Sequence, residues 1–232
     1  MSVEEQAAYL LHSRKYTDTR IIVELLTQEY GRVSAVFRKS KKNVANLQAF
    51  TPLLVNWRGK ASLKTITHIE PQDKLIVLNG TALYCGFYLN EILMRCLPQE
   101  DAVEAIFHLY KKTLSKLGEN RAPKISMTLE RELRLFELTL LETLGFGINF
   151  YQDADEQTID KANNYYYHFQ ESIGFIKTEN ITAKSFPSEV IIAIREGDLH
   201  DRTNLNYAKN LCRIALKSLL GDKPLKSREL FR

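Results

Sequence analysis

The spacing of apolar residues changes near residue 80, and this change constrains the fold more than any other feature of the chain. Before it, short runs rich in Val, Ile, Leu, Tyr, Phe and Thr alternate with turn sequences such as EYGR. Such runs are typical of β-strands. The predicted strands cover residues 8–16, 19–27, 32–40, 50–58 and 63–71. Five short strands at this spacing predict a small β-barrel or sandwich, and the pattern alone does not separate an OB-fold from an SH3-like barrel.

After Gly80 the apolar residues recur at helical spacing. The predicted helices cover residues 81–97, 100–117, 125–147, 187–197 and 206–221. Residues 149–180 differ, and "ESIG" within them indicates the turn of a short hairpin. The expected fold class is therefore α+β, with a strand domain at 1–80 and a mainly helical domain at 81–232 that carries a short β and loop insert at about 149–180.

Positive charge is concentrated at the two ends of the chain. Residues 1–80 hold 12 Lys and Arg against 7 Asp and Glu, and residues 203–232 hold 7 against 2. The segment between them is acidic, although the net charge of the whole chain is only +4. This asymmetry predicts an anionic partner for the ends, and nucleic acid is the most common such partner.

The composition excludes several other classes of protein. No apolar run is long enough to span a bilayer, and the N-terminus lacks the pattern of a secretory signal. The three cysteines, Cys85, Cys96 and Cys212, show no C-x-x-C spacing. We expect a cytoplasmic protein with free thiols, no membrane contact and no bound metal or other cofactor.

Basic residues gather in three clusters of the strand domain. The candidates for phosphate contacts are Arg14, Lys15, Arg38, Lys39, Lys41, Lys42, Arg58, Lys60 and Lys64. Lys and Arg side chains neutralise phosphates and release counterions, which gives affinity that is independent of sequence and sensitive to salt. A run of charge can also be only a solvated surface, but three clusters on one small barrel favour a binding groove.

Aromatic residues of the strand domain are candidates for base stacking. Phe37 shares a strand face with Val33 and Ala35, which predicts a core position. Tyr16 lies next to Lys15 and a turn, so it is the preferred stacking residue. Trp57 stays undecided between core and surface.

No catalytic signature is present in the chain. The sequence lacks a P-loop, a G-x-S-x-G motif and an H-E-x-x-H motif, and its five histidines are scattered. We expect a protein that is not an enzyme and has no catalytic residues.

The ordered set of segments resembles the RecO family of bacterial DNA repair proteins. The similarity lies in "YLLHSRKYTDTRIIVELLTQEYGRVSAVFRKSKK", in "LQAFTPLLVNWRGKASLKT", and in "LYCGFYLNEILMRCL", "LFELTLLETLGFGINF" and "KPLKSRELFR". The resemblance implies an N-terminal five-stranded OB-fold barrel followed by a helical domain. It also implies binding of single- and double-stranded DNA, annealing of complementary strands, help in loading recombinase, and work at the nucleoid.

The resemblance further implies two protein partners, RecR and the acidic C-terminal tail of single-strand-binding protein. A receptor for such a tail needs an apolar notch beside fixed positive charge. The candidates are Arg134, Lys209, Arg213 and Lys217, of which the last three are spaced to share one helix face. Some members of the family hold zinc with four cysteines in the insert, but residues 149–180 here contain none. We expect packing of Tyr165, Tyr166, Tyr167 and Phe169 to hold the insert instead.

Two other functions remain open from the sequence. The chain could be a generic OB-fold module that binds RNA or DNA without annealing, or an interaction protein whose basic clusters only aid solubility. The helical domain favours the mediator, because a plain binding module does not need about 150 further residues.

Overall fold

The computed structural model describes residues 2–39, 47–73, 76–120, 125–162 and 164–231. The chain forms two compact units, one of residues 1–124 with 224–232 and one of residues 125–223. The predicted boundary at residue 80 marks the change from strands to helices inside the first unit. As a boundary between domains it stays a prediction.

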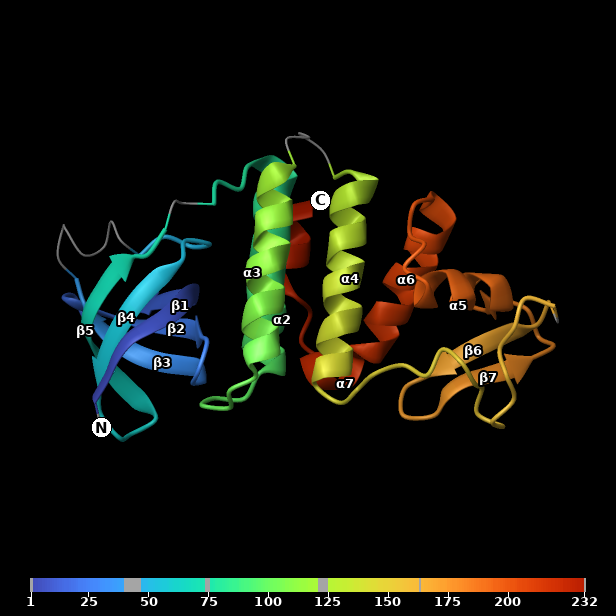
Figure 1. The fold of residues 1–232 in the computed structure, drawn as a ribbon, viewed down its shortest axis with the longest axis horizontal. Helices are drawn as coiled ribbons and strands as arrows, with labels where there is room; N and C mark the ends of the chain where they lie inside the picture. The colour runs from blue at the N-terminus through green and yellow to red at the C-terminus, as the bar shows by residue number, and fades with distance from the viewer. Residues whose placement is uncertain (1, 40–46, 74–75, 121–124, 163, 232) are drawn as a thin grey trace. The chain divides into compact units, whose positions relative to one another are not determined.

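Five strands open the first unit and close into a barrel (Figure 1). They are β1 (Ser2–Lys15), β2 (Arg20–Thr27), β3 (Gly31–Arg38), β4 (Leu53–Arg58) and β5 (Leu63–Pro71). The order around the barrel is β1-β2-β3-β5-β4, with β3 parallel to β5 and β4 returning to β1. This is a five-stranded Greek-key arrangement, and the predicted OB-fold is confirmed.

Alternate residues of the strands fill the barrel. Val33, Ala35 and Phe37 on β3 all belong to its core, which confirms the predicted position of Phe37. Trp57 is 1% exposed and packs edge-on against Tyr30, so the undecided tryptophan is a core residue. The outer face of each strand is left for the helices, for solvent or for a ligand.

Two helices and the chain's end pack with the barrel in the first unit (Figure 1). These elements are α2 (Gly80–Cys96), α3 (Glu104–Glu119) and the 3₁₀ helix η1 (Lys226–Phe231). The loop between α2 and α3 approaches the start of β3 so closely that a side chain at Gly31 would collide with the carbonyl oxygen of Asp101. Gly31 also has a φ of +63°, which other residues adopt at a cost.

A buried asparagine joins α2 to the barrel. The pairing of β1 with β2 is irregular between Leu10 and His12, and Asn90 Nδ2 donates hydrogen bonds to the carbonyl oxygens of Leu11 at 2.9 Å and Leu10 at 3.4 Å. The hydroxyl of Tyr110 on α3 donates to Asn90 Oδ1. One side chain of α2 therefore satisfies buried polar groups of both β1 and α3.

The second unit contains helices and a small sheet. Its elements are α4 (Met127–Thr143), β6 (Tyr166–Gln170), β7 (Gly174–Thr178), β8 (Phe186–Pro187), α5 (Ser188–Arg195), α6 (Arg202–Ala215) and α7 (Lys217–Leu220). The predicted hairpin is confirmed as β6 and β7, with "ESIG" at its turn. Tyr167 is buried and Phe169 packs against Phe175, so two of the four predicted aromatics hold the insert, whereas Tyr165 is 39% exposed.

Replacing Asn90 by alanine should lower the free energy of unfolding by about 2–4 kcal/mol, because two buried carbonyl groups and the Tyr110 hydroxyl lose their partner. Denaturant unfolding measures the change. The control Asn206→Ala alters an exposed residue of α6 and should stay within about 0.5 kcal/mol of the wild type. Equal effects of the two substitutions would mean that Asn90 does not join the elements as described.

Candidate nucleic-acid interface

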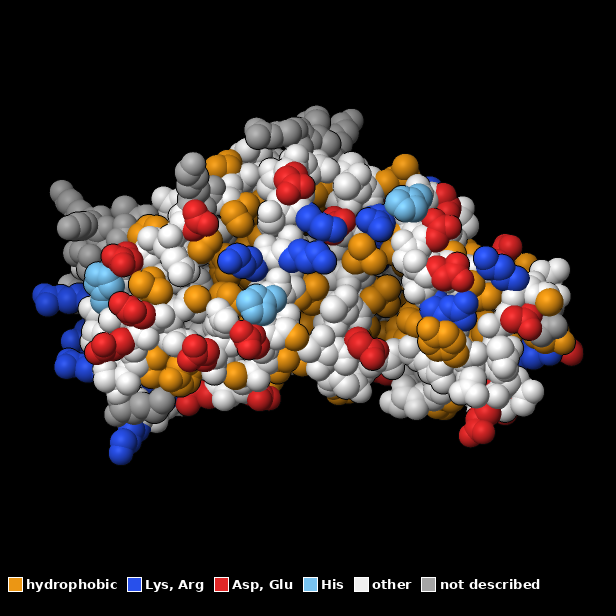
Figure 2. Space-filling view, viewed as in Figure 1, with side chains coloured by type: hydrophobic (Ala, Val, Ile, Leu, Met, Phe, Trp, Pro, Cys, Tyr) orange, Lys and Arg blue, Asp and Glu red, His pale blue; other side chains and the backbone are white. Residues whose placement is uncertain are grey.

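One end of the barrel brings together basic residues of three strands. There β1 ends, β2 begins and β3 ends, with Lys15 opposite Ile21 and Arg20 opposite Arg38. The backbone N–H of Lys39 donates to the carbonyl oxygen of Thr19, which ties the chain after β3 to the β1–β2 turn. Figure 2 shows Lys and Arg side chains projecting over the barrel at the left of the view.

A single row of paired residues crosses all five strands on the outer face. It is formed by Arg58, Thr65, Val36, Ile22 and Arg14 in the order β4, β5, β3, β2, β1. The row faces outward because its neighbours Trp57 and Phe37 lie in the core. Arg14 and Arg58 are exposed at its two ends, separated by four strand spacings or roughly 19 Å along the curved sheet. We call this line of residues the barrel row.

Arg20 and Arg38 place two positive charges directly opposite each other next to the barrel row. Both side chains are exposed, and neither forms an ion pair with a residue that the structure describes. Like charges in directly opposite positions destabilise a sheet by roughly 0.2–1 kcal/mol. A bound anion would remove this repulsion, so the pair has the character of a binding site rather than of a structural contact.

Arg20 was missing from the sequence-derived candidates. It is the single basic residue of "DTRII", where the other charged residue is Asp18, so it formed no basic cluster in the sequence. A signal was nevertheless available. Counting back from the β2–β3 turn, where Thr27 pairs with Gly31, places Arg20 opposite Arg38.

The structure corrects the prediction for Lys64. Its side chain is only 6% exposed, and its ammonium group lies 2.8 Å from a carboxylate oxygen of Glu100. Lys64 lies two residues before the core residue Ile66 and shares its strand face, so it points to the buried side of β5. It is therefore not part of the exposed basic surface, and we omit it from the interface.

The remaining predicted residues lie at this barrel end or at the far end of the barrel row, where Arg58 pairs with Ser2 at the start of β1. Arg14, Arg38, Lys39, Arg58 and Lys60 are exposed. Lys15 is exposed as well and pairs with Asp18 at 2.7 Å, a contact that costs little to break at the surface. Tyr16 is 53% exposed in the β1–β2 turn, so its stacking role stays a prediction. Lys41 and Lys42 lie outside the described residues.

Another part of the barrel surface is already covered by the chain itself. An OB-fold commonly binds oligonucleotides on the face of strands 2 and 3. Here Glu24 of β2 accepts hydrogen bonds from Ser34 and Arg32 of β3, and Gln99 from the α2–α3 loop donates to Ser34 Oγ. Arg32 also donates to the carbonyl oxygen of Leu97. The α2–α3 loop therefore occupies this part of the face and leaves the basic end exposed.

The second unit carries another group of cations on α4 and α6. Burial lowers the pKa of Lys209, Glu130 opposes this shift, and the charges of Arg213, Arg134 and Arg202 lower the pKa further. The predicted residues Arg134, Lys209 and Arg213 are thus close enough to interact, and Arg202 joins them by pairing with Glu130 at 2.8 Å.

Two details of the predicted peptide site are corrected. Arg134 is buried and pairs with Glu137 at 2.6 Å. Its guanidinium group is therefore not available for direct contact with a peptide at the surface. Helix α6 ends at Ala215 and Lys217 begins the separate helix α7, so the three predicted residues do not share one helix.

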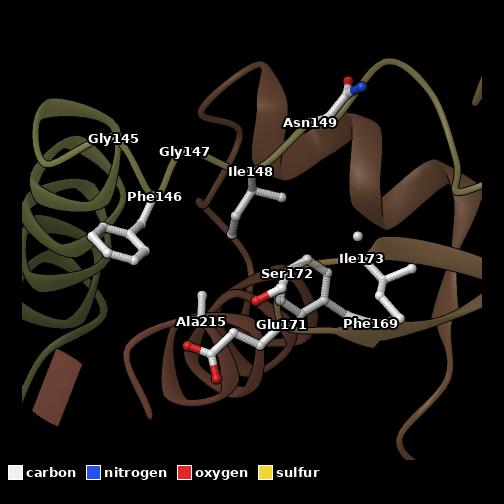
Figure 3. Close-up of a pocket in the computed structure, with 11 residues that line it drawn as sticks. Gly145, Phe146, Gly147, Ile148, Asn149, Phe169, Glu171, Ser172, Ile173 and Ala215 are labelled. Carbon is white, nitrogen blue, oxygen red and sulfur yellow. The ribbon is translucent and has the colours of Figure 1, made fainter. Parts of the chain in front are cut away.

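An apolar pocket of about 260 Å³ lies elsewhere in the second unit, after α4 and beside the hairpin. Phe146, Ile148, Phe169 and Ile173 contribute its apolar walls (Figure 3). Its ionisable lining residue is Glu171, a carboxylate that accepts a hydrogen bond from the N–H of Ser218. A negative wall does not suit an acidic peptide, so this pocket does not match the predicted receptor.

The three cysteines are buried, and Cys212 lies beside Arg134 and Glu137 in the second unit. Burial raises the pKa of the Cys96 thiol to about 12, against the small opposing effect of Arg95, and it raises that of Cys212 well above the ordinary value. Among the described residues, no group of three or more His, Cys, Asp or Glu side chains could hold a metal ion. Across the same ranges, no helix combines the length and apolar character needed to cross a membrane.

The Arg20–Arg38 pair generates a test that needs no ligand. Arg38→Gln should raise the free energy of unfolding by roughly 0.2–1 kcal/mol at low salt, because the repulsion between like charges disappears. The control Arg58→Gln removes a charge that faces the neutral Thr65, and it should give no gain. Denaturant unfolding at two salt concentrations measures both. The gain should shrink at high salt, and a gain that is independent of salt would contradict the electrostatic explanation.

Comparison with known proteins covers the whole chain. The family model described as recombination protein O N terminal matches residues 1–74, and the one described as recombination protein O C terminal matches residues 78–187. The chain is 40% identical over 240 residues to the DNA repair protein RecO of Cellvibrio japonicus, covering 100% of this chain and 98% of that protein. It is 39% identical to the RecO protein of Pasteurella multocida over 97% of this chain and 93% of that protein. On this evidence, the chain belongs to the RecO family of DNA repair proteins.

Proposed function

We propose that this protein is a recombination mediator that acts at the nucleoid in the cytoplasm. In this proposal it binds single- and double-stranded DNA, anneals complementary strands, and helps to load recombinase onto DNA coated with single-strand-binding protein. The observation that carries the proposal is the set of exposed arginines at one barrel end, in which Arg20 and Arg38 face each other without an acidic partner among the described residues. The family's role in DNA repair supports it.

The chemistry of the barrel end suits phosphates rather than bases. Guanidinium groups present a planar fork of donors that matches two phosphate oxygens. The arginines lie along the barrel row and beside it, so they can follow a strand backbone across the sheet. Contacts of this kind position a nucleic acid without reading its sequence.

Annealing follows from the same contacts without covalent chemistry. Two DNA strands repel each other through their phosphates, and a cationic surface reduces that repulsion. Because binding through phosphates leaves the base edges accessible, a second strand can pair with the first.

Two protein partners complete the proposal. The cations around Lys209 suit the acidic C-terminal tail of single-strand-binding protein, because they concentrate positive charge on one surface of the second unit. RecR is the second partner, and the family resemblance supports it without assigning residues. A generic OB-fold binder would use only the barrel end and would not anneal coated strands.

The first test compares annealing by two triple variants. Arg14→Ala, Arg20→Ala and Arg38→Ala together should change the affinity for single strands in a salt-dependent way. The slope of log K against log salt concentration should become less negative by about 2, since each lost phosphate contact contributes about 0.7. Annealing of complementary oligonucleotides coated with single-strand-binding protein should slow in parallel. The control carries Lys111→Ala, Lys161→Ala and Lys184→Ala, which remove the same charge from exposed sites outside the barrel.

Two results of this test would count against the proposal. An unchanged salt slope in the arginine variant would mean that the barrel end is not the DNA contact. Wild-type protein that binds bare strands but does not anneal coated ones would favour the generic binder.

The peptide site has its own test. Lys209→Ala should weaken binding of an acidic peptide with an apolar C-terminal residue about tenfold, because a charge-assisted contact is lost. Wild-type affinity should fall as the pH rises through the lowered pKa of Lys209, below the range where lysines ordinarily titrate. Fluorescence anisotropy between about pH 7 and 10 follows both effects, with Lys161→Ala as the control. A pH profile that is the same for the wild type and Lys209→Ala would exclude this lysine.

A further inference from the structure

A second pocket, of about 490 Å³, opens in the first unit between β1, α2 and η1. Its walls are mainly apolar and include Leu11, Phe87, Met94 and Leu230. Phe87 is 40% exposed and Leu230 is 41% exposed, so large apolar side chains face solvent here. The volume lies within the range of about 300–1,000 Å³ that is usual for sites of small molecules.

Hydrogen bonds hold the wall that η1 contributes. Glu91 of α2 accepts from the backbone N–H groups of Lys226 and Ser227 and from the Ser227 hydroxyl. Arg95 pairs with Glu91 at 3.0 Å and donates to the carbonyl oxygen of Pro224. Burial alone would raise the pKa of Glu91, but these partners hold it below its ordinary value.

The charge that remains at the pocket is positive. The carboxylate of Glu91 is neutralised by Arg95 and by its hydrogen bonds, and Lys226 adds a positive charge to the lining. His12 also lines the pocket and lies opposite Glu24, whose carboxylate is paired with Arg32. The site therefore combines an apolar wall with the positive charge of Lys226, and this combination suits a ligand with apolar parts and negative charge.

The pocket continues the basic surface of the barrel. His12 and Arg14 are two residues apart on β1 and point to the same side, with a spacing of about 6.8 Å. His12 lines the pocket, and Arg14 ends the barrel row. A ligand bound at Arg14 therefore lies about 6.8 Å along β1 from His12, which lines the pocket.

We infer that this pocket, which we call the α2–η1 pocket, binds an unpaired base of a DNA strand whose phosphates lie on Arg14 and Lys226. Phe87 and His12 supply flat faces on which a base can stack, and Met94 and Leu230 exclude water from its edges. The inference rests on the proposed function and adds a specific contact to it. Bases in a duplex are stacked within the helix, so the pocket distinguishes single strands from duplexes.

Oligonucleotides with and without bases provide the test. The wild type should bind a single-stranded oligonucleotide about tenfold more tightly than one with several abasic positions, because stacking is lost with the base. His12→Ala and Phe87→Leu should each remove most of this difference and leave duplex binding unchanged. Phe146→Leu alters an aromatic residue of the second unit with 48% exposure and should have no effect.

Folding of the variants is checked by their free energy of unfolding, since Phe87 also packs against Phe50 at 5.4 Å. His12 is exposed, so its variant keeps the test valid if Phe87→Leu fails to fold. A wild type that binds abasic and normal strands equally would overturn the inference. So would variants that lose only the acidic peptide, because the pocket would then be a peptide site.

Duplex binding separates this inference from the proposed function. Binding to duplex depends on the barrel row, so normal duplex binding without a preference for bases would overturn the α2–η1 pocket alone. Wild-type protein that binds neither single strands nor duplex would overturn the proposed function and this inference with it.

Discussion

The irregularity in β1 determines how the rest of the first unit is built. Where the pairing with β2 shifts between Leu10 and His12, backbone carbonyl groups need partners that the ladder does not provide. The Asn90 side chain supplies these hydrogen bonds and is itself oriented by Tyr110. This contact brings α2 against β1, forms one side of the α2–η1 pocket, and leaves Arg14 exposed beyond the irregularity. The α2–η1 pocket and the exposed Arg14 therefore both lie next to the segment of β1 that this one buried amide holds.

Much of the fold could be predicted from the sequence, because strands and helices impose different periods on apolar residues. All five barrel strands and the hairpin turn were expected, although β1 begins at Ser2, six residues before the predicted strand. The choice between an OB-fold and another small barrel could not be made from the pattern, since it depends on the parallel pairing of β3 with β5 across a long connection. The end of α6 was also missed. The helix ends at Ala215, but Leu216 continues the apolar pattern, so residues 206–221 read as one helix.

The candidate site was predictable only in part. Clusters of Lys and Arg pointed to the barrel end that we propose as the interface, but they could not show which side chains are paired. Lys64 failed because its partner Glu100 comes from the distant α2–α3 loop, and Arg134 because Glu137 neutralises it within its own helix. Arg20 was missed because its importance comes from the strand register and not from neighbours in the sequence.

The ion pair between Lys64 and Glu100 would limit the footprint of DNA bound as we propose. Glu100 has a φ of +57° and is held by a hydrogen bond from its N–H to the carbonyl oxygen of Arg32, so its carboxylate is tethered beside Lys64. A tethered group acts like a free one at an effective concentration in about the millimolar range. A phosphate must outcompete this built-in anion to reach Lys64. The protein thus carries its own anion beside Lys64, and DNA bound as we propose would contact the exposed arginines instead.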